Sequence, residues 1–192
     1  MEVGAYDGDT FSNTSGLADL GWEGLYVEPV PRYARACARR HAANKGISVA
    51  RCAVGTEMAE IDLHYGEGLT TALKDQVEVY EQVEWTKGFH KGQRMRVPQF
   101  PLEHLLLKAG IEPGFELLVV DVEGSEDAVF ESFSLDAWKP RVMIVELIDG
   151  HPSFQSFDHV IRRSSRLRTR IQQAGYREHY VDEVNTIFSR AN

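Results

Sequence analysis

The stretch Glu2-Val3-Gly4-Ala5-Tyr6-Asp7-Gly8 decides the fold of this chain, together with Leu25-Tyr26-Val27-Glu28, which ends twenty residues after Gly8. This spacing predicts a strand, a glycine turn, a helix and a second strand that ends in a carboxylate. In an open α/β sheet such a unit binds an adenosine-containing cofactor, because the glycines let the backbone approach it and the acid accepts hydrogen bonds from the ribose hydroxyls. We therefore expect a Rossmann-like sheet with an adenosine site at its first turn.

The charges at this turn favour one class of cofactor. The sequence is not GxGxxG, because Tyr6 stands where a middle glycine would be expected. Asp7 and Asp9 would repel the pyrophosphate of a nicotinamide or flavin dinucleotide at the helix start. A cofactor with a positive charge suits the turn better, which indicates S-adenosylmethionine with its sulfonium.

Length and composition limit the number of domains and the classes of function. The 192 residues fit one domain, 1–192. The net charge of −8 argues against a general nucleic-acid binder. The chain has no run of about 18 apolar residues and no signal-peptide pattern, so we expect no membrane span and a cytoplasmic location. Cys37 and Cys52 indicate small buried side chains in a reducing compartment.

Short apolar runs alternate with longer helix-like stretches, which predicts a three-layer, doubly wound α/β sheet. The nearly continuous apolar runs at 117–122 and 142–145 suit central strands covered on both faces. Expected strands lie at 2–4, 24–28, 48–54, 61–65, 116–122, 142–147, 176–181 and 185–190. Expected helices lie at 15–20, 31–43, 102–109, 125–133 and 157–174.

Three segments suggest function or assembly. The polar segment 74–96, with Trp85 and Phe89, predicts an irregular lid or substrate loop, with a disordered excursion as the alternative. Five arginines between 161 and 171 indicate a solvated helix face, or a patch for an anionic substrate or acidic partner. The first strand begins at Glu2, so it would be exposed, which would favour a homodimer, or it would fray.

Several short blocks of sequence, in their order along the chain, resemble the FkbM family of S-adenosylmethionine-dependent methyltransferases. Val3 to Gly8 is similar to the family's first motif, VGAxxG. Further similar blocks, which cover nearly all of the chain, are Ser12-Asn13-Thr14, Gly21 to Pro29, Cys52 to Gly55, Val120 to Glu126 and Asn185 to Phe188. The resemblance implies a seven-stranded, mostly parallel sheet with a reversed last strand, and O-methylation of a hydroxyl. The segment 74–96 matches no family motif, so the acceptor is open between a small molecule and a glycan.

The cofactor site follows from the motif and the resemblance. Gly4 and Gly8 would form the turn beneath the methionine part of the cofactor, and Glu28 would bind the ribose. The resemblance places Glu2 opposite the methionine ammonium. Ala53 would leave room for adenine, although Cys52 and Ala53 fit plain core packing equally well. The expected cofactor-binding residues are Glu2, Gly4, Ala5, Tyr6, Asp7, Gly8, Asn13, Glu28, Pro29, Cys52, Ala53, Asp121, Val122 and Glu123.

Carboxylates at the ends of two apolar strands are the candidates for chemistry. Asp121 and Glu123 follow one strand, where ligands collect when strand order reverses, and Ser125 would cap the next helix and leave Asp121 free. We expect Asp121 near the transferred methyl, with Glu146 or His151 as the base that takes the hydroxyl proton.

Two further features of the site have alternatives. Thr70 and Thr71 would belong to a substrate loop, although such a loop can simply bond its own backbone. Asp121, Glu123, Glu146, Asp149 and His151 together are typical of a site for Mg²⁺, Ca²⁺ or Mn²⁺, but no tight ligand spacing supports a metal and we do not favour one.

Two other functions compete with methyl transfer. One is a nucleotide-dependent oxidoreductase on a similar sheet, against which Asp7 and Asp9 argue. The other is a non-catalytic module that binds the cofactor and uses the arginine-rich helix as a contact surface.

Overall fold

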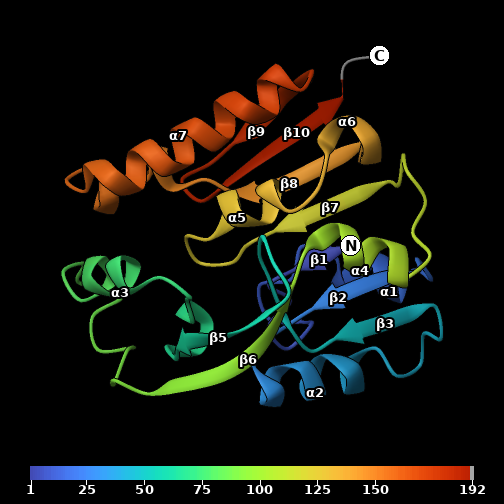
Figure 1. Cartoon of the computed structure of the whole chain (residues 1–192), viewed down its shortest axis with the longest axis horizontal. Helices are drawn as coiled ribbons and strands as arrows, with labels where there is room; N and C mark the ends of the chain where they lie inside the picture. Colours follow the sequence, from blue (N-terminus) through green and yellow to red (C-terminus); the bar gives the residue numbers. More distant parts are fainter. Residues whose placement is uncertain (191–192) are drawn as a thin grey trace.

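The structure, a computed structural model, describes residues 1–190, and its centre is a seven-stranded sheet in the order β3-β2-β1-β7-β8-β10-β9 (Figure 1). Neighbours from β3 to β8 pair in parallel, and β10 runs antiparallel to both β8 and β9. These strands are β1 Glu2–Val3, β2 Gly24–Val27, β3 Ile47–Ala50, β7 Leu117–Val120, β8 Val142–Glu146, β9 Tyr176–Val181 and β10 Asn185–Arg190. The mostly parallel α/β sheet with a reversed C-terminal strand is confirmed.

Helices occupy the predicted places between the strands. They are α1 Ser15–Asp19, α2 Pro31–Arg40, α4 Leu102–Lys108, α5 Glu126–Glu131 and α7 Asp158–Gln173. Pro31 begins α2, where its missing N–H costs no hydrogen bond. No helix within residues 1–190 combines the length and the apolar character that crossing a membrane requires.

The core forms between the middle of the large sheet and its helices. Leu118 and Met143, from neighbouring strands, are fully buried with Phe130 of α5. Leu167 and Ile171 lie one turn apart on α7 and join the same cluster, which places one stripe of that helix against the core. Each fully buried side chain of this kind contributes about 1.5–3 kcal/mol to folding.

A second, three-stranded sheet corrects two sequence predictions. Its order is β4-β6-β5, with β4 Ala53–Val54, β5 Ala59–His64 and β6 Arg94–Phe100. The strand expected at 48–54 is therefore two strands, because the chain leaves the large sheet after Ala50 and Ala53 pairs with Gln99 of β6 instead. The segment 74–96 is irregular only in part, since α3 Lys74–Tyr80 and the start of β6 lie on either side of the turns at 81–93. A further short helix, α6, spans Leu135–Trp138.

The position of β1 overturns the expectation of an exposed first strand. β1 pairs with β2 on one side and β7 on the other, and Glu2 is 4 % exposed. Glu2 is therefore neither frayed nor on a sheet edge. The reason for expecting a homodimer is wrong, and the oligomeric state stays a prediction.

Candidate active site

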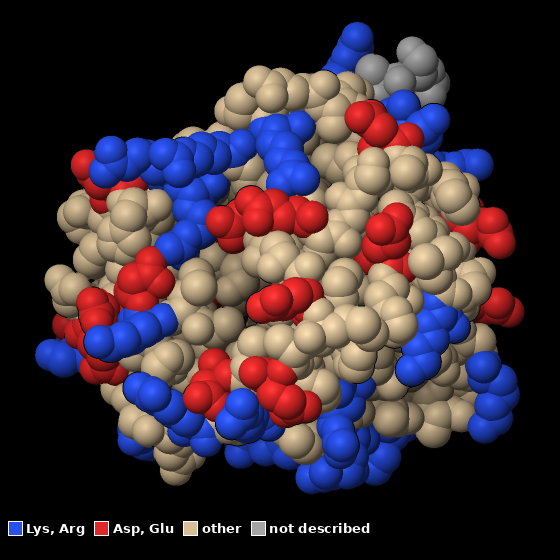
Figure 2. Space-filling view, in the orientation of Figure 1, with Lys and Arg blue, Asp and Glu red and all other residues tan. Residues whose placement is uncertain are grey.

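The carboxyl ends of β1, β2, β7 and β8 open onto a cavity of about 900 Å³. β1 and β7 are neighbours in the sheet although far apart in the chain, so their ends form the switch point where ligands bind in such sheets. Figure 2 shows a hollow near the middle of this face with acidic side chains around it. The predicted residues that line the cavity are Glu2, Gly4, Ala5, Tyr6, Asn13, Glu28, Pro29, Cys52, Ala53, Thr70, Asp121, Val122, Glu123, Glu146 and His151.

Gly4 makes the close approach between β1 and β7. Its φ is +87°, and a Cβ there would lie 1.6 Å from the carbonyl oxygen of Asp121. Gly8, with φ +78°, is restricted by α2, because a Cβ would meet the Cys37 sulfur at 2.7 Å. Gly4 therefore shapes the cavity floor, whereas Gly8 packs the loop against α2 and does not line the cavity.

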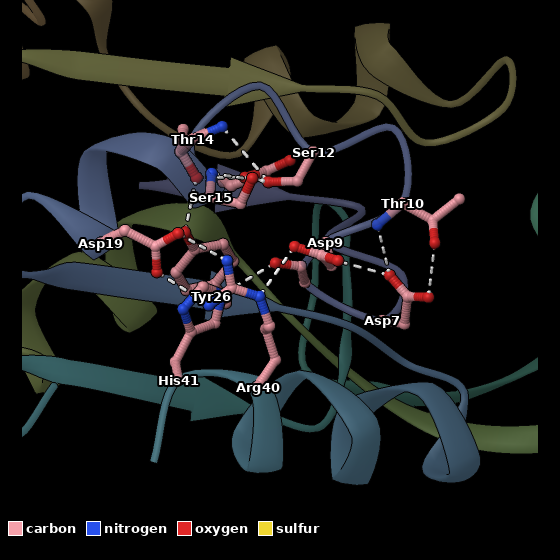
Figure 3. Close-up of polar contacts among 12 residues, drawn as sticks. Asp7, Asp9, Thr10, Ser12, Thr14, Ser15, Asp19, Tyr26, Arg40 and His41 are labelled. Atoms are coloured by element: carbon pink, nitrogen blue, oxygen red, sulfur yellow. Dashed lines mark hydrogen bonds and ion pairs between the residues drawn. The ribbon is translucent and has the colours of Figure 1, made fainter. Parts of the chain in front are cut away.

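The acids after the turn bind the loop itself (Figure 3). The Asp7 carboxylate accepts hydrogen bonds from the amides of Asp9 and Thr10 and from the Thr10 hydroxyl, at 2.8–3.0 Å. Asp9 and Asp19 pair with Arg40 of α2, at 2.7 Å each. Asp7 does not line the cavity, contrary to the prediction. Because Arg40 offsets the charge of Asp9, repulsion of a pyrophosphate is a weaker argument than the sequence indicated.

Glu2 is held by the loop between β1 and α1. Its carboxylate accepts hydrogen bonds from the Ser12 hydroxyl at 2.9 Å, the Asn13 amide at 3.4 Å and the Thr14 hydroxyl. Burial raises the pKa of Glu2, and the Thr14 and Ser12 hydrogen bonds oppose that rise. Glu2 therefore anchors the loop that brings Asn13 to the cavity, a role that its position in the motif did not reveal.

Glu28 has a different set of partners at the end of β2. Its two carboxylate oxygens accept hydrogen bonds from the backbone amides of Tyr6 at 2.9 Å and Val30 at 2.7 Å. Burial raises its pKa to about 7, against the effect of these two bonds. Each oxygen keeps a further lone pair, so this carboxylate on the cavity wall can still accept hydrogen bonds from a ligand.

Three carboxylates gather at the ends of β7 and β8. One oxygen each of Asp121, Glu123 and Glu146 lies within 4.8 Å of the other two. Burial raises the pKa of Asp121 to about 6, and contact with Glu146 limits the rise. Burial, and then the charge of Asp121, raises the pKa of Glu146 well above its ordinary value. Burial, and then the charge of Asp121, also raises the pKa of Glu123, whose carboxylate accepts a hydrogen bond from the Tyr80 hydroxyl. The three oxygens could also hold a divalent cation.

The helix after Asp121 is not capped as predicted. The Ser125 side chain makes no capping hydrogen bond. Instead, the Glu126 carboxylate accepts from the amides of Val122 at 3.0 Å and Gly124 at 3.1 Å. Burial raises the pKa of Glu126 to about 7. Glu126 thus holds the loop that carries Glu123, which the sequence analysis missed because this acid reaches backwards from the helix start.

Comparison with known families decides the class of this site. The sequence pattern of the Methyltransferase FkbM domain matches residues 2–178. The chain belongs to the FkbM methyltransferase family. A search of curated proteins finds no match to the chain. Methyltransferases of this family typically use S-adenosylmethionine, and the match favours neither the oxidoreductase nor the non-catalytic alternative.

The outer part of this FkbM-family cavity comes from segments that the sequence left without a motif. His151 Nδ1 accepts a hydrogen bond from the Ser153 amide at 3.1 Å, and its Nε2 lies 4.0 Å from a Glu183 oxygen. The His151 ring lies beside the rings of Trp85 and Phe154, with centroids 5.9 and 4.9 Å away. These rings form an aromatic wall that no local pattern predicted.

Two expected members of the FkbM-family site lie elsewhere. Thr71 is 1 % exposed, does not line the cavity, and donates to the Glu123 carbonyl at 2.8 Å. Asp149 is not part of the carboxylate cluster, because Arg168 of α7 pairs with it at 2.6 Å. Both side chains therefore support neighbouring segments.

Proposed function

We propose that residues 1–192 form a single-domain, cytoplasmic, S-adenosylmethionine-dependent O-methyltransferase whose acceptor is a hydroxyl of a small molecule or glycan. We also keep the prediction that its sheet is wound in three layers. The observation that carries the proposal is that Glu28 and the neighbouring carboxylates Asp121 and Glu146 open onto one cavity. At about 900 Å³ this cavity lies at the upper end of the range for ligand pockets.

The charge of the cavity supports the cofactor. Among the described residues, no Lys or Arg lines it, whereas eight Asp and Glu side chains do. When bound, S-adenosylmethionine would supply a methyl group on a positively charged sulfur, which the ionised members of this lining, Asp121 and Asp182 among them, attract. Glu28 would accept hydrogen bonds from the ribose, and Ala5, Asn13 and Ala53 would bound the same end of the cavity.

The carboxylate pair supports removal of the hydroxyl proton. Asp121, with a pKa of about 6, is mostly ionised at neutral pH, whereas burial and the charge of Asp121 raise the pKa of Glu146 well above its ordinary value. We therefore assign the proton of the acceptor hydroxyl to Asp121, which lies beside Glu146, in place of Glu146 or His151, the bases expected from the sequence. Positioning the hydroxyl would supply much of the remaining rate gain.

His151 would position the acceptor. Because Nδ1 accepts from the Ser153 amide, the neutral ring carries its proton on Nε2 and donates rather than accepts there. A donor at the cavity wall can hold an acceptor oxygen in place. Thr70 would contribute to the same wall.

Single substitutions test this division of roles. We expect Asp121→Asn to lower kcat by about 10²–10⁴-fold, the range for loss of a general base, and to change the dissociation constant of S-adenosylhomocysteine far less. His151→Asn should lower kcat by about tenfold or less and raise KM. Release of S-adenosylhomocysteine over a panel of polyhydroxyl acceptors is the readout. Full turnover by Asp121→Asn would overturn the role of Asp121.

A metal is not part of this proposal. Asp121, Glu123 and Glu146 have the oxygens for one, so the activity is to be measured after exhaustive treatment with a chelator. We expect it unchanged. A loss that added Mg²⁺ or Mn²⁺ restores would assign the three carboxylates to a cation instead.

A further inference from the structure

The cavity has two ends with different chemistry. The inner end, around Gly4 and Glu28, is the one proposed for the cofactor. The outer end is built by α3 and the segment after it, the turns after β8, and the β9–β10 hairpin. Its lining includes Trp85, His151, Phe154, Asp182, Glu183 and Asn185. The outer end is therefore where an acceptor would lie.

Fixed negative charge stands at the mouth of this outer end. Asp182 and Glu183 are both exposed and lie in the turn between β9 and β10. The amides of Val184 and Asn185 donate to one oxygen of Asp182, at 2.9 and 2.6 Å. These bonds hold the pKa of Asp182 below its ordinary value, so the carboxylate stays ionised. The nearby Tyr180 hydroxyl adds to this effect, and the carboxylate remains exposed and accessible to a ligand.

Neighbouring cations do not neutralise this charge. Two arginines of α7 form ion pairs with acids other than Asp182 and Glu183. Arg163 pairs with Asp75 at 2.5 Å, and Arg168 pairs with Asp149 and Glu178. The Glu183 carboxylate lies 4.0 Å from Nε2 of His151. An anionic acceptor would therefore meet repulsion and find no Lys or Arg among the described lining residues.

Two other features of the outer end suit a positively charged ligand that donates hydrogen bonds. Trp85 is half-exposed, and its ring, with those of His151 and Phe154, forms an aromatic wall of the kind that binds cations. Asn185 lines the cavity, and its buried Oδ1 has no hydrogen-bond partner among residues 1–190. An N–H or O–H group of a ligand would satisfy it.

We propose that the methyl acceptor carries a protonated amine, as an amino sugar or aminocyclitol does, and that Asp182 and Glu183 bind this ammonium beside Trp85. The inference rests on the proposed function, because it names the acceptor of the same cavity. It excludes phosphorylated sugars, uronic acids and other anions as acceptors. The amine is recognised at the mouth, while a hydroxyl of the same molecule reaches Asp121.

Calorimetry with defined probes tests the proposal. The first titration uses S-adenosylhomocysteine alone, and lack of binding would overturn the proposed function and this inference with it. The saturated complex is then titrated with methyl glucosaminide and 2-deoxystreptamine, and with methyl N-acetylglucosaminide and methyl glucuronide. We expect an amine probe to bind at least about tenfold more tightly than the N-acetyl probe, and the glucuronide not to bind.

Other outcomes bear on the amine alone. If S-adenosylhomocysteine binds but the N-acetyl probe or the glucuronide binds as tightly as the amines, the inference is wrong and the methyltransferase proposal stands. The same holds if neither amine binds. Raising the salt from 0.05 to 0.5 M should weaken the amine probes and leave the N-acetyl probe unchanged.

A charge-removing variant assigns the effect to the hairpin. In Asp182→Asn with Glu183→Gln, the amide oxygen of residue 182 can still accept from Val184 and Asn185, so the turn is retained. We expect about tenfold weaker binding of the amine probe and unchanged binding of S-adenosylhomocysteine. Unchanged amine binding would overturn the assignment.

The matched control removes two charges from β5. Glu60 and Asp62 are exposed and alternate with Ile61 and Leu63, which line the cavity, so they project to the opposite face. Glu60→Gln with Asp62→Asn should leave the binding of every probe unchanged. An equal loss in this control would mean that net charge alone, and no ammonium site, governs binding.

Discussion

Single residues of the same type have different roles in this site, and their hydrogen-bond partners explain why. Glu2 begins β1 and Glu28 follows β2, and both side chains are buried near the first turn. Glu2 is surrounded by donors from residues 12–14, so it serves its own loop. Glu28 receives two backbone amides and keeps open lone pairs at the cavity. This spare capacity is the reason to propose Glu28, rather than Glu2, as the carboxylate that binds the ribose.

Gly4 is the residue whose replacement should cost most. We expect Gly4→Ala to lower the free energy of unfolding by at least about 3 kcal/mol, because its φ is +87° and the new Cβ would overlap the Asp121 carbonyl. Urea denaturation measures this, and failure to fold is the extreme of the same outcome. Gly16→Ala is the control: no atom lies within 4 Å of that Cβ, so we expect a change within about 1 kcal/mol, towards greater stability. Equal effects of the two substitutions would contradict the argument.

At the scale of elements, the segment 74–100 shows where local pattern misled. Its polar composition indicated a loop, but Val79 and Tyr80 of α3 are buried against Ile148 and Phe154. In β6, the alternation of Arg94 and Arg96 with Met95 and Val97 is a strand pattern, and Val97 is 2 % exposed. The small sheet that results covers the cavity from the side of Ala53 and Leu63.

The end of α6 offers a test of helix termination. Lys139 is the C-cap, with φ +49° and ψ +52°, a left-handed conformation that costs a residue with a Cβ about 1 kcal/mol. Lys139→Gly should therefore raise the free energy of unfolding by about 0.5–1 kcal/mol. Ala109→Gly is the matched comparison, because Ala109 caps α4 at φ −82°, where glycine should destabilise by a similar amount. Denaturation midpoints that move in the same direction would refute the explanation.

For the whole molecule, the distribution of charge matters more than the net charge of −8. Acidic side chains surround the hollow, whereas Lys and Arg lie along α7 and the lower edge of the same face (Figure 2). Arg163 and Arg168 of α7 pair with Asp75 and Asp149, so these two arginines hold neighbouring segments around the cavity, whereas Arg162, Arg166 and Arg170 are exposed.

This charge predicts how the affinity for the cofactor depends on pH. The pKa of Asp121 is about 6, so lowering the pH from 8 to 5 adds a proton and removes a negative charge from the cavity. S-adenosylmethionine should then bind more weakly relative to S-adenosylhomocysteine, which lacks the sulfonium charge, by about tenfold, the effect of one pKa unit. Calorimetry at several pH values gives the ratio of the two dissociation constants, in which effects common to both ligands cancel. In Asp121→Asn the ratio should vary less with pH, because only other groups such as Glu28, with a pKa of about 7, still titrate in the cavity. A ratio in the natural chain that varies no more than in this variant would contradict the prediction.

The reversed last strand was expected only from the family resemblance, whereas the parallel sheet, the first turn and several residues on the cavity wall could be predicted from the sequence itself. These follow from short-range patterns: apolar runs, glycine at positive φ, and carboxylates at strand ends whose common edge is set by parallel pairing. Only the tertiary structure decided which carboxylates have spare capacity, that Glu126 supports the loop after β7, and that Trp85, His151 and the β9–β10 turn meet at the mouth of the cavity. The physical reason is that burial, pKa and hydrogen-bond partners depend on contacts between segments far apart in the chain, such as Tyr80 with Glu123.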